Sequence, residues 1–320
     1  MDCPPALTTR FAADLGALWT GEGRLGLAVS GGPDSLALLL LAHAVLPGRI
    51  AAATVDHGLR AEGAAESALV GQICSELKVP HAALRVVVEP GNVQAQARAA
   101  RYTALAGWLE REGLEALATA HHADDQAETL LARLNRGSGV AGLAGVRARG
   151  VVPGTRMPLL RPLLGWRRSD LAEVVALAGL TPAQDPSNTD DRFDRARLRK
   201  ALAGADWLDV PALALSAANL ADADAALEWA AQREWSECVA KGPMGLTYRP
   251  KAPRAVALRV LARIVTELDG EAPRGSAVAR LFDSLLAHQP ASIGNLVARV
   301  MPDGWSFTKA PKPRSTSSRA

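Results

Sequence analysis

The chain has few cysteines, few aromatic residues and no long apolar run in its 320 residues. Its three cysteines, Cys3, Cys74 and Cys238, form neither a CxxC pair nor a zinc-ligand spacing. Such sparse cysteines are typical of a reducing compartment, so we expect the cytoplasm. No stretch approaches the ~18 uncharged apolar residues of a membrane span. The first residues also lack the basic and apolar regions of a signal peptide.

Charge is low overall but unevenly distributed. The formal net charge is +3, yet residues 192–200 carry five positive side chains and one negative, and residues 309–320 carry four positive and no acid. We therefore expect an anionic partner to be bound at particular segments rather than by a uniformly basic surface.

Short apolar stretches alternate with amphipathic ones in the first half of the chain. The expected strands and helices occupy residues 24–30, 34–44, 49–56, 62–77, 82–88, 92–112, 114–120 and 124–135 in alternation. This order predicts an α/β fold with a parallel, doubly wound sheet and right-handed crossovers. In such sheets ligands bind at the carboxyl ends of the strands.

The rest of the chain has a different character. From about residue 206 it is mainly helical in pattern, and its last residues are basic and of low complexity. We expect an α/β domain over residues 1–205, a mainly helical domain over 206–308, and a disordered basic tail over 309–320.

The sequence SGGPDS follows the first expected strand. Gly31 and Gly32 would let backbone N–H groups approach an anion, and the next helix adds its partial positive charge. Ser30 and Ser35 can donate hydroxyl hydrogen bonds to phosphate, while Asp34 can hold a metal ion or the loop itself. The lysine of a Walker A loop is missing, which disfavours γ-phosphate transfer. A tight turn capped by Asp34 is the alternative interpretation.

The sequence HHADDQAET follows the fourth expected strand. It crowds His121, His122, Asp124, Asp125 and Glu128 at the start of a helix. Three carboxylates there could bind Mg²⁺ or an ammonium group, and a histidine could act as an acid or a base. Alternatively, the acids only stabilise the positive end of the helix. The choice of general base among these residues stays open.

Other polar residues give weaker signals. Asp56 and His57 end the second expected strand and could contact a base or ribose. Arg133 and Arg136 are typically solvated, but beside a nucleotide they would contact phosphate or RNA. The segment RFDRARLRK places positive side chains on one stripe of a helix, which suits a phosphate backbone or is simply a solvated face. Its members are Arg192, Arg195 and Arg199, with Arg197 and Lys200 beside them.

Together these motifs resemble a known family. SGGPDS resembles the pyrophosphate loop (PP-loop) of N-type ATP pyrophosphatases. VDHGLR, HHADDQAETLLARLNRGSGVAGLAGV, RPLL and DPSNTDDRFDRARLRK are similar to the bacterial tRNA(Ile)-lysidine synthetase family over residues 27–200. The resemblance implies that ATP, with Mg²⁺, adenylates the C2 oxygen of the wobble cytidine in the CAU anticodon of tRNA(Ile). Free lysine then attacks C2 and releases AMP. The C-terminal half resembles the family's first tRNA-binding domain.

The residues and the resemblance together give a set of expected roles. The expected catalytic residues are Asp34, His122, Asp124, Asp125 and Glu128, with Mg²⁺ on Asp34 and Asp125. The expected nucleotide-binding residues are Ser30, Gly31, Gly32, Pro33, Asp34, Ser35, Asp56, His57, Arg136 and Gly137. The expected tRNA or substrate contacts are Arg133, Arg161, Arg192, Arg195, Arg197 and Arg199, of which Arg161 follows from the resemblance alone.

Two departures and three rivals accompany this reading. Ala196 stands where the family commonly has asparagine, so an amide contact is missing there. The chain is also short after its expected boundary. One rival is a PP-loop tRNA thiolase, which would use paired cysteines or an iron–sulfur cluster. Another is a phosphohydrolase with a metal on His121, His122, Asp124 and Asp125, and the third is a non-catalytic RNA-binding module. No membrane partner is expected, and a homodimer is left open.

Overall fold

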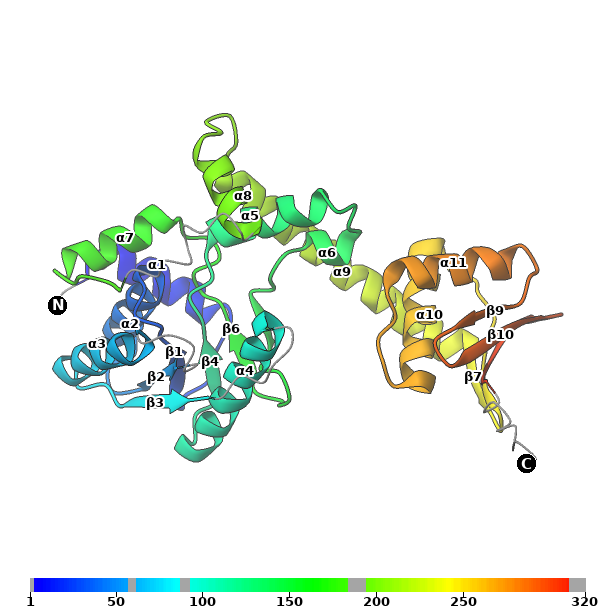
Figure 1. Ribbon diagram of the computed structural model, residues 1–320, viewed down its shortest axis with the longest axis horizontal. Helices are drawn as coiled ribbons and strands as arrows, with labels where there is room; N and C mark the ends of the chain where they lie inside the picture. Colours follow the sequence, from blue (N-terminus) through cyan, green and yellow to red (C-terminus); the bar gives the residue numbers. More distant parts are fainter. Residues whose placement is uncertain (1–2, 57–61, 87–92, 184–193, 311–320) are drawn as a thin grey trace, which may run out of the picture. The chain divides into compact units, whose positions relative to one another are not determined.

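A six-stranded sheet forms the centre of the N-terminal part in the computed structural model (Figure 1), which describes residues 3–56, 62–86, 93–183 and 194–310. The strand order is β3-β2-β1-β4-β6-β5, with β5 the antiparallel edge strand. Its strands are β1 Leu25–Ala28, β2 Ile50–Asp56, β3 His81–Arg85, β4 Ala116–Ala118, β5 Arg149–Val151 and β6 Pro158–Leu160. The predicted parallel, doubly wound sheet is confirmed, and the direction of winding reverses between β1 and β4.

Helices cover both faces of this sheet because successive strand residues point to opposite sides. On β2, Ile50 and Ala52 pack into one apolar core, and Ala51 and Ala53 into another. The first core contains α1, α2 and α7, and the second contains α4. The helices of this part are α1 Pro5–Gly16, α2 Pro33–Val45, α3 Glu62–Glu76, α4 Val93–Glu112, α5 Ala123–Leu134, α6 Val140–Leu143, α7 Arg168–Leu177 and α8 Asp194–Ala203.

Helix α2 is apolar around its whole circumference. Its residues from Leu36 to Ala42 are all buried, between the sheet and the helices α1 and α7. A helix of this kind is stabilised by packing on every side rather than by one amphipathic stripe. Its buried position fixes its N-terminal turn at the end of β1.

The chain divides into two compact units, Met1–Ala221 and Asp222–Ala320, within helix α9 Val210–Cys238. The second unit contains α10 Arg254–Asp269, α11 Gly275–Leu286 and a five-stranded antiparallel sheet of order β7-β8-β11-β10-β9. Its strands are β7 Val239–Gly242, β8 Gly245–Tyr248, β9 Ala291–Ile293, β10 Leu296–Met301 and β11 Gly304–Lys309. Helices predominate, as predicted, but the sheet was not predicted.

The end of the chain requires one correction. Lys309 belongs to β11, and the N–H of Ala310 donates to Asn295 at 2.7 Å. Residues 309 and 310 are therefore ordered rather than part of the tail assigned to 309–320, and residues 311–320 lie outside the described part of the chain. The boundary at 205 stays a prediction. Among the helices that the structure describes, none combines the length and the apolar character needed to cross a membrane.

Candidate active site

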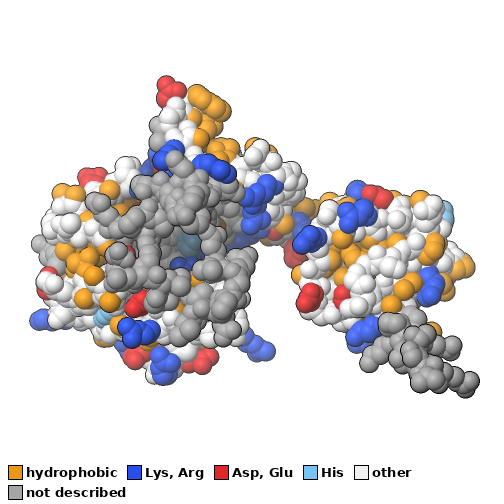
Figure 2. Space-filling view, viewed as in Figure 1, with side chains coloured by type: hydrophobic (Ala, Val, Ile, Leu, Met, Phe, Trp, Pro, Cys, Tyr) orange, Lys and Arg blue, Asp and Glu red, His pale blue; other side chains and the backbone are white. Residues whose placement is uncertain are grey.

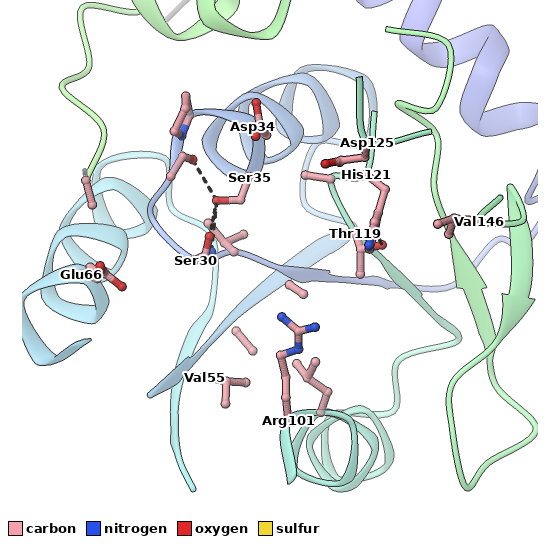
Figure 3. A pocket seen from close by; sticks show the side chains of 18 of the residues that line it. Ser30, Asp34, Ser35, Val55, Glu66, Arg101, Thr119, His121, Asp125 and Val146 are labelled. Carbon is pink, nitrogen blue, oxygen red and sulfur yellow. Dashed lines mark hydrogen bonds between the residues drawn. The ribbon is translucent and has the colours of Figure 1, made fainter. Parts of the chain in front are cut away.

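The loop between β1 and α2 forms a closed cradle. Gly31 has φ +87°, a left-handed conformation that favours glycine. The Ser35 hydroxyl lies 3.2 Å from that of Ser30, accepts a hydrogen bond from the Ser30 N–H at 3.1 Å, and donates to the Gly32 carbonyl at 3.0 Å (Figure 3). Gly32 caps α2, and Pro33 is its first residue. The loop therefore presents the N-terminal turn of a buried helix, an arrangement that suits an anion.

His122 lies between three carboxylates at the start of α5 and is only 1% exposed. Its Nε2 is 3.4 Å from Asp34 Oδ2 and 3.5 Å from Asp125 Oδ2, and its Nδ1 is 3.5 Å from Asp124 Oδ2. Burial opposes protonation, but the close carboxylates of Asp124, Asp34 and Asp125 outweigh it and raise the pKa of His122 to about 9. The imidazolium thus draws acids of α2 and α5 together.

Asp124 has a largely structural environment. Its Oδ2 accepts a hydrogen bond from the Arg168 N–H at 2.9 Å, and Arg167 Nε lies 3.5 Å away. Burial alone would raise the pKa of Asp124, but His122, Arg168 and Arg167 hold it well below its usual range. Asp124 therefore ties the start of α5 to the start of α7.

Glu128 is 3% exposed and faces two arginines. Arg199 Nε donates to Glu128 Oε1 at 2.9 Å, and Arg168 lies 3.7 Å from the same oxygen. Burial opposes the charged form of Arg199, but the bond with Glu128 raises its pKa overall. This pair places α8 against α5 beside the cradle.

His121 differs from its neighbour. Its Nδ1 is 3.0 Å from the Thr119 hydroxyl. Burial lowers the pKa of His121 to about 4, and nearby arginines contribute to this although Asp125 opposes it. The two adjacent histidines therefore differ in charge at neutral pH.

A cavity of about 530 Å³ joins these groups at the carboxyl ends of β1, β2 and β4. Figure 2 shows a hollow in this unit in which histidine and basic side chains are visible. The expected residues that line the cavity are Ser30, Gly32, Pro33, Asp34, Ser35, Asp125, Glu128 and Arg199. Its place is the switch point of the sheet, where ligands of such folds bind.

Other expected residues lie elsewhere. Asp56 ends β2, with its Oδ2 4.0 Å from Arg85 Nε. Arg161 is 7% exposed and donates to the Arg147 carbonyl at 2.6 Å. The exposed ones are Arg133, Arg136, Gly137 and Arg197. His57, Arg192 and the side chain of Arg195 lie outside the described residues.

Several cavity residues were not predicted, and they come from helices and strands without a motif. Glu66 comes from α3, Arg101 and Tyr102 from α4, Thr119 from just beyond β4, and Val146 from the loop after α6. In the sequence, only the positions of these residues relative to the expected strands and helices could have indicated that they line the cavity. An arginine inside a helical pattern is ordinarily assigned to a solvated face.

The acid groups suit a metal that is shared with a substrate. In the described part of the chain, no three His, Cys, Asp or Glu side chains form a metal site by themselves. Asp34 and Asp125 both reach His122 Nε2, and Asp34 Oδ1 is buried without a hydrogen-bond partner among the described atoms. One or two carboxylates plus substrate phosphates are the usual ligands of Mg²⁺.

The cysteines are remote from this chemistry. Cys74 and Cys238 are buried in different apolar cores, and none of the three cysteines lines the cavity. Burial raises the pKa of Cys74 to about 12. A reactive thiolate is therefore not available in the described cavity, which disfavours the thiolase alternative.

Comparisons with known proteins agree with the fold and the motifs. A family model for the PP-loop domain matches residues 7–205. The tRNA(Ile)-lysidine synthase of Novosphingobium aromaticivorans is 49% identical over 311 residues, which cover 96% of this chain and 95% of the relative. That of Zymomonas mobilis is 41% identical over 296 residues, covering 91% and 89%.

A solved structure is similar in fold alone. The U34-tRNA thiolase NcsA from Methanococcus maripaludis superposes with a TM-score of 0.56 at 15% sequence identity. The match covers 67% of this chain and 76% of that one. At this identity the likeness concerns the arrangement of strands and helices and says nothing of the reaction.

Proposed function

The chain belongs to the tRNA(Ile)-lysidine synthase family of PP-loop proteins, and from this we propose that it ligates free lysine to C2 of a wobble cytidine. The target is the CAU anticodon of tRNA(Ile). ATP first adenylates the C2 oxygen and releases pyrophosphate, and the lysine amine then displaces AMP. The observation that best supports the proposal is the meeting of the SGGPDS cradle and the His122 acid cluster in one cavity.

In the first step the cradle binds the phosphates that leave. The N–H groups of the N-terminal turn of α2 and the Ser30 hydroxyl donate to phosphate oxygens, while the Ser35 hydroxyl, bonded to the Gly32 carbonyl, holds the loop. Asp34 and Asp125 would hold Mg²⁺, which supplies neutralising charge for the phosphates. His122 keeps these two carboxylates close together when they are free of metal.

In the second step the attacking amine loses a proton. His121 lines the cavity and is a neutral imidazole near pH 7, and it can accept the proton that becomes acidic on the amine once the carbon–nitrogen bond forms. Asp125 and Glu128 lie on the same wall and attract the lysine ammonium before it is deprotonated. The carbon–nitrogen bond forms at C2 as the bond from C2 to the adenylated oxygen breaks.

The RNA would be held outside the cavity by basic side chains. Arg133 lies on α5, Arg136 in the turn after it and Arg197 on α8. All three are exposed, so they can contact phosphates. The C-terminal unit binds the body of the tRNA in this proposal. In this proposal the enzyme works in the cytoplasm. Light scattering would decide whether it is a homodimer.

The first test is AMP release. The protein is incubated with ATP, Mg²⁺, an unmodified CAU-anticodon tRNA(Ile) and radiolabelled lysine, and each component is omitted in turn. We expect AMP and pyrophosphate only with this tRNA, and label in the RNA only with lysine. A tRNA in which the wobble cytidine is replaced is the control. Production of ADP, or no AMP in any mixture, would contradict the proposal.

A further inference from the structure

Three arginines gather around one buried tyrosine, and of these four residues Arg101 and Tyr102 line the cavity. Tyr102 of α4 is 2% exposed, and the guanidinium carbons of Arg98 and Arg101 lie 5.0 and 5.5 Å from its ring centroid. The Arg161 guanidinium also interacts with the Tyr102 side chain. Figure 3 shows Arg101 extending from α4 into the cavity, on the side away from Asp34. We call Arg98, Arg101 and Arg161 the arginine cluster.

Like charges lie close together in the arginine cluster, and Arg161 is its most buried member. Arg161 is 7% exposed, and its Nε is buried with no hydrogen-bond partner among the described residues. Burial lowers the pKa of Arg161, and the charge of Arg98 lowers it further. No described carboxylate pairs with Arg98 or Arg161. A buried guanidinium that lacks a full set of partners destabilises the protein, whereas an oxyanion would satisfy it.

The cavity carries charges of both signs on different walls. Asp34, Asp125 and Glu128 line it from α2 and α5, with Arg199 paired to Glu128, and Arg101 enters from α4. All three arginines also disfavour protonation of His121, so their positive potential reaches the reaction site. A substrate with a cationic amine at one end and an anion at the other matches this polarity.

We propose that the arginine cluster is an oxyanion subsite for the acceptor substrates, either for the α-carboxylate of lysine or for an RNA phosphate beside the target cytidine. The inference rests on the proposed function and adds Arg98 and Arg101, which neither the motifs nor the comparisons assign, to Arg161, which the resemblance already implies. Guanidinium groups bind carboxylate and phosphate through paired hydrogen bonds. A carboxylate bound there would leave the side-chain amine of lysine free to extend toward Asp125 and His121.

The test compares Arg101→Gln and Arg98→Gln with Arg111→Gln. Arg111 lies on the same helix but is exposed and does not line the cavity, so its variant is the matched control. Each protein is assayed with lysine and with cadaverine, which keeps the amine and lacks the carboxylate. If the bound anion is the lysine carboxylate, we expect Arg101→Gln to lower kcat/KM for lysine about 10–100-fold and to leave kcat/KM for cadaverine unchanged. Arg98→Gln should have a smaller effect of the same kind, because Arg98 is exposed.

To test for an RNA phosphate, the same variants are assayed at varied tRNA concentrations and varied salt concentrations. If the anion is a phosphate, Arg101→Gln raises KM for tRNA and reduces the salt slope of binding by about 1, and it affects lysine and cadaverine equally. Circular dichroism checks that each variant is folded, and Arg98→Gln keeps the test valid if Arg101→Gln is not.

Two failures can be told apart. If the wild type ligates lysine and neither variant differs from Arg111→Gln in either arm, the subsite is wrong and the proposed function stands. If the wild type ligates nothing, the proposed function fails. Equilibrium binding of radiolabelled lysine and of tRNA to wild type and Arg101→Gln then decides the subsite, and equal binding by both proteins would overturn it.

Discussion

Arg199 Nε donates a hydrogen bond to Glu128 Oε1 at 2.9 Å, and this contact joins α8 to α5 at the edge of the cavity. The carboxylate is buried, while the Arg199 side chain is 29% exposed. One member belongs to the motif HHADDQAET and the other to RFDRARLRK. The pair therefore holds a basic helix beside the acid cluster, and both side chains line the cavity.

Replacing either member of this pair should cost both stability and activity. Arg199→Gln leaves Glu128 buried, with Arg168 at 3.7 Å as its remaining cationic neighbour among the described residues. We expect a coupling energy of about 1–3 kcal/mol in a double-mutant cycle with Glu128→Gln, measured by urea unfolding. Strictly additive single and double variants would contradict an interaction between the two groups.

Asp34 and Asp125 should be required for turnover but not for folding. Asp34→Asn and Asp125→Asn keep the side-chain size and remove a negative charge that would bind Mg²⁺. We expect each variant to lose at least ~100-fold in AMP release at an almost unchanged Tm. Glu76→Gln, an exposed acid on α3, is the control. Normal activity in either folded variant would remove that residue from the mechanism.

Gln126 should position the wall of the cavity without touching substrate. It is 4% exposed, and its Nε2 donates to the Val146 carbonyl at 2.8 Å while its Oε1 accepts from the Val146 N–H at 2.7 Å. Gln126→Met leaves both backbone groups unpaired, so we expect a loss of about 1–3 kcal/mol in unfolding free energy and a lower kcat.

The variant Gln126→Glu separates hydrogen bonding from size. Its carboxylate cannot donate to the Val146 carbonyl, but its protonated form can. The pKa of the buried glutamate should lie above its unfolded value. The loss of unfolding free energy of Gln126→Glu relative to the wild type should therefore decrease as the pH falls toward that pKa. Gln126→Met should show no such recovery. A parallel response of both variants to pH would contradict this role.

The sequence predicted where its motifs meet better than it predicted the strands of the C-terminal unit. The strand ends and the motifs SGGPDS and HHADDQAET converge because carboxyl ends of parallel strands share one edge. Arg101 could not be found, because a cation in a helical pattern is ordinarily solvated and only the contact with buried Tyr102 reveals it. Strands such as Gly245–Tyr248 and Ala291–Ile293 are too short to establish an alternating pattern.

Contacts in the folded protein also changed the roles that can be assigned to single residues. Asp124 was predicted to be catalytic from its motif, yet its carboxylate accepts the Arg168 N–H. The two histidines are adjacent in the sequence, but His122 is cationic and His121 is neutral near pH 7. Burial lowers the pKa of both, and three acids outweigh it at His122, whereas nearby arginines add to it at His121. Whether Asp124 also acts in catalysis stays a prediction.

Glu234 should stabilise the C-terminal unit in a pH-dependent manner. It is 8% exposed, and its Oε1 accepts hydrogen bonds from the Tyr248 hydroxyl at 3.1 Å and from the N–H groups of Lys251 and Ala252 at 2.7 and 3.1 Å. Burial would raise the pKa of Glu234, but these bonds lower it below 4.5 overall. Since the folded pKa is depressed, the stabilisation is present above the unfolded pKa and is lost as the pH falls through the folded value.

The variant Glu234→Gln tests this because its amide oxygen still accepts hydrogen bonds but carries no charge. At pH 7 we expect a loss of about 1–2 kcal/mol in unfolding free energy, because charge-assisted bonds are stronger than neutral ones. The difference from wild type should decrease as the pH is lowered below 4.5. Glu237→Gln is the matched control: Glu237 lies on the same helix in an exposed pair with Arg233, at 3.6 Å, and should change stability by no more than about 0.5 kcal/mol. A constant difference between Glu234→Gln and wild type across this pH range would mean that the negative charge of Glu234 contributes nothing, and that only the shape of its side chain is used.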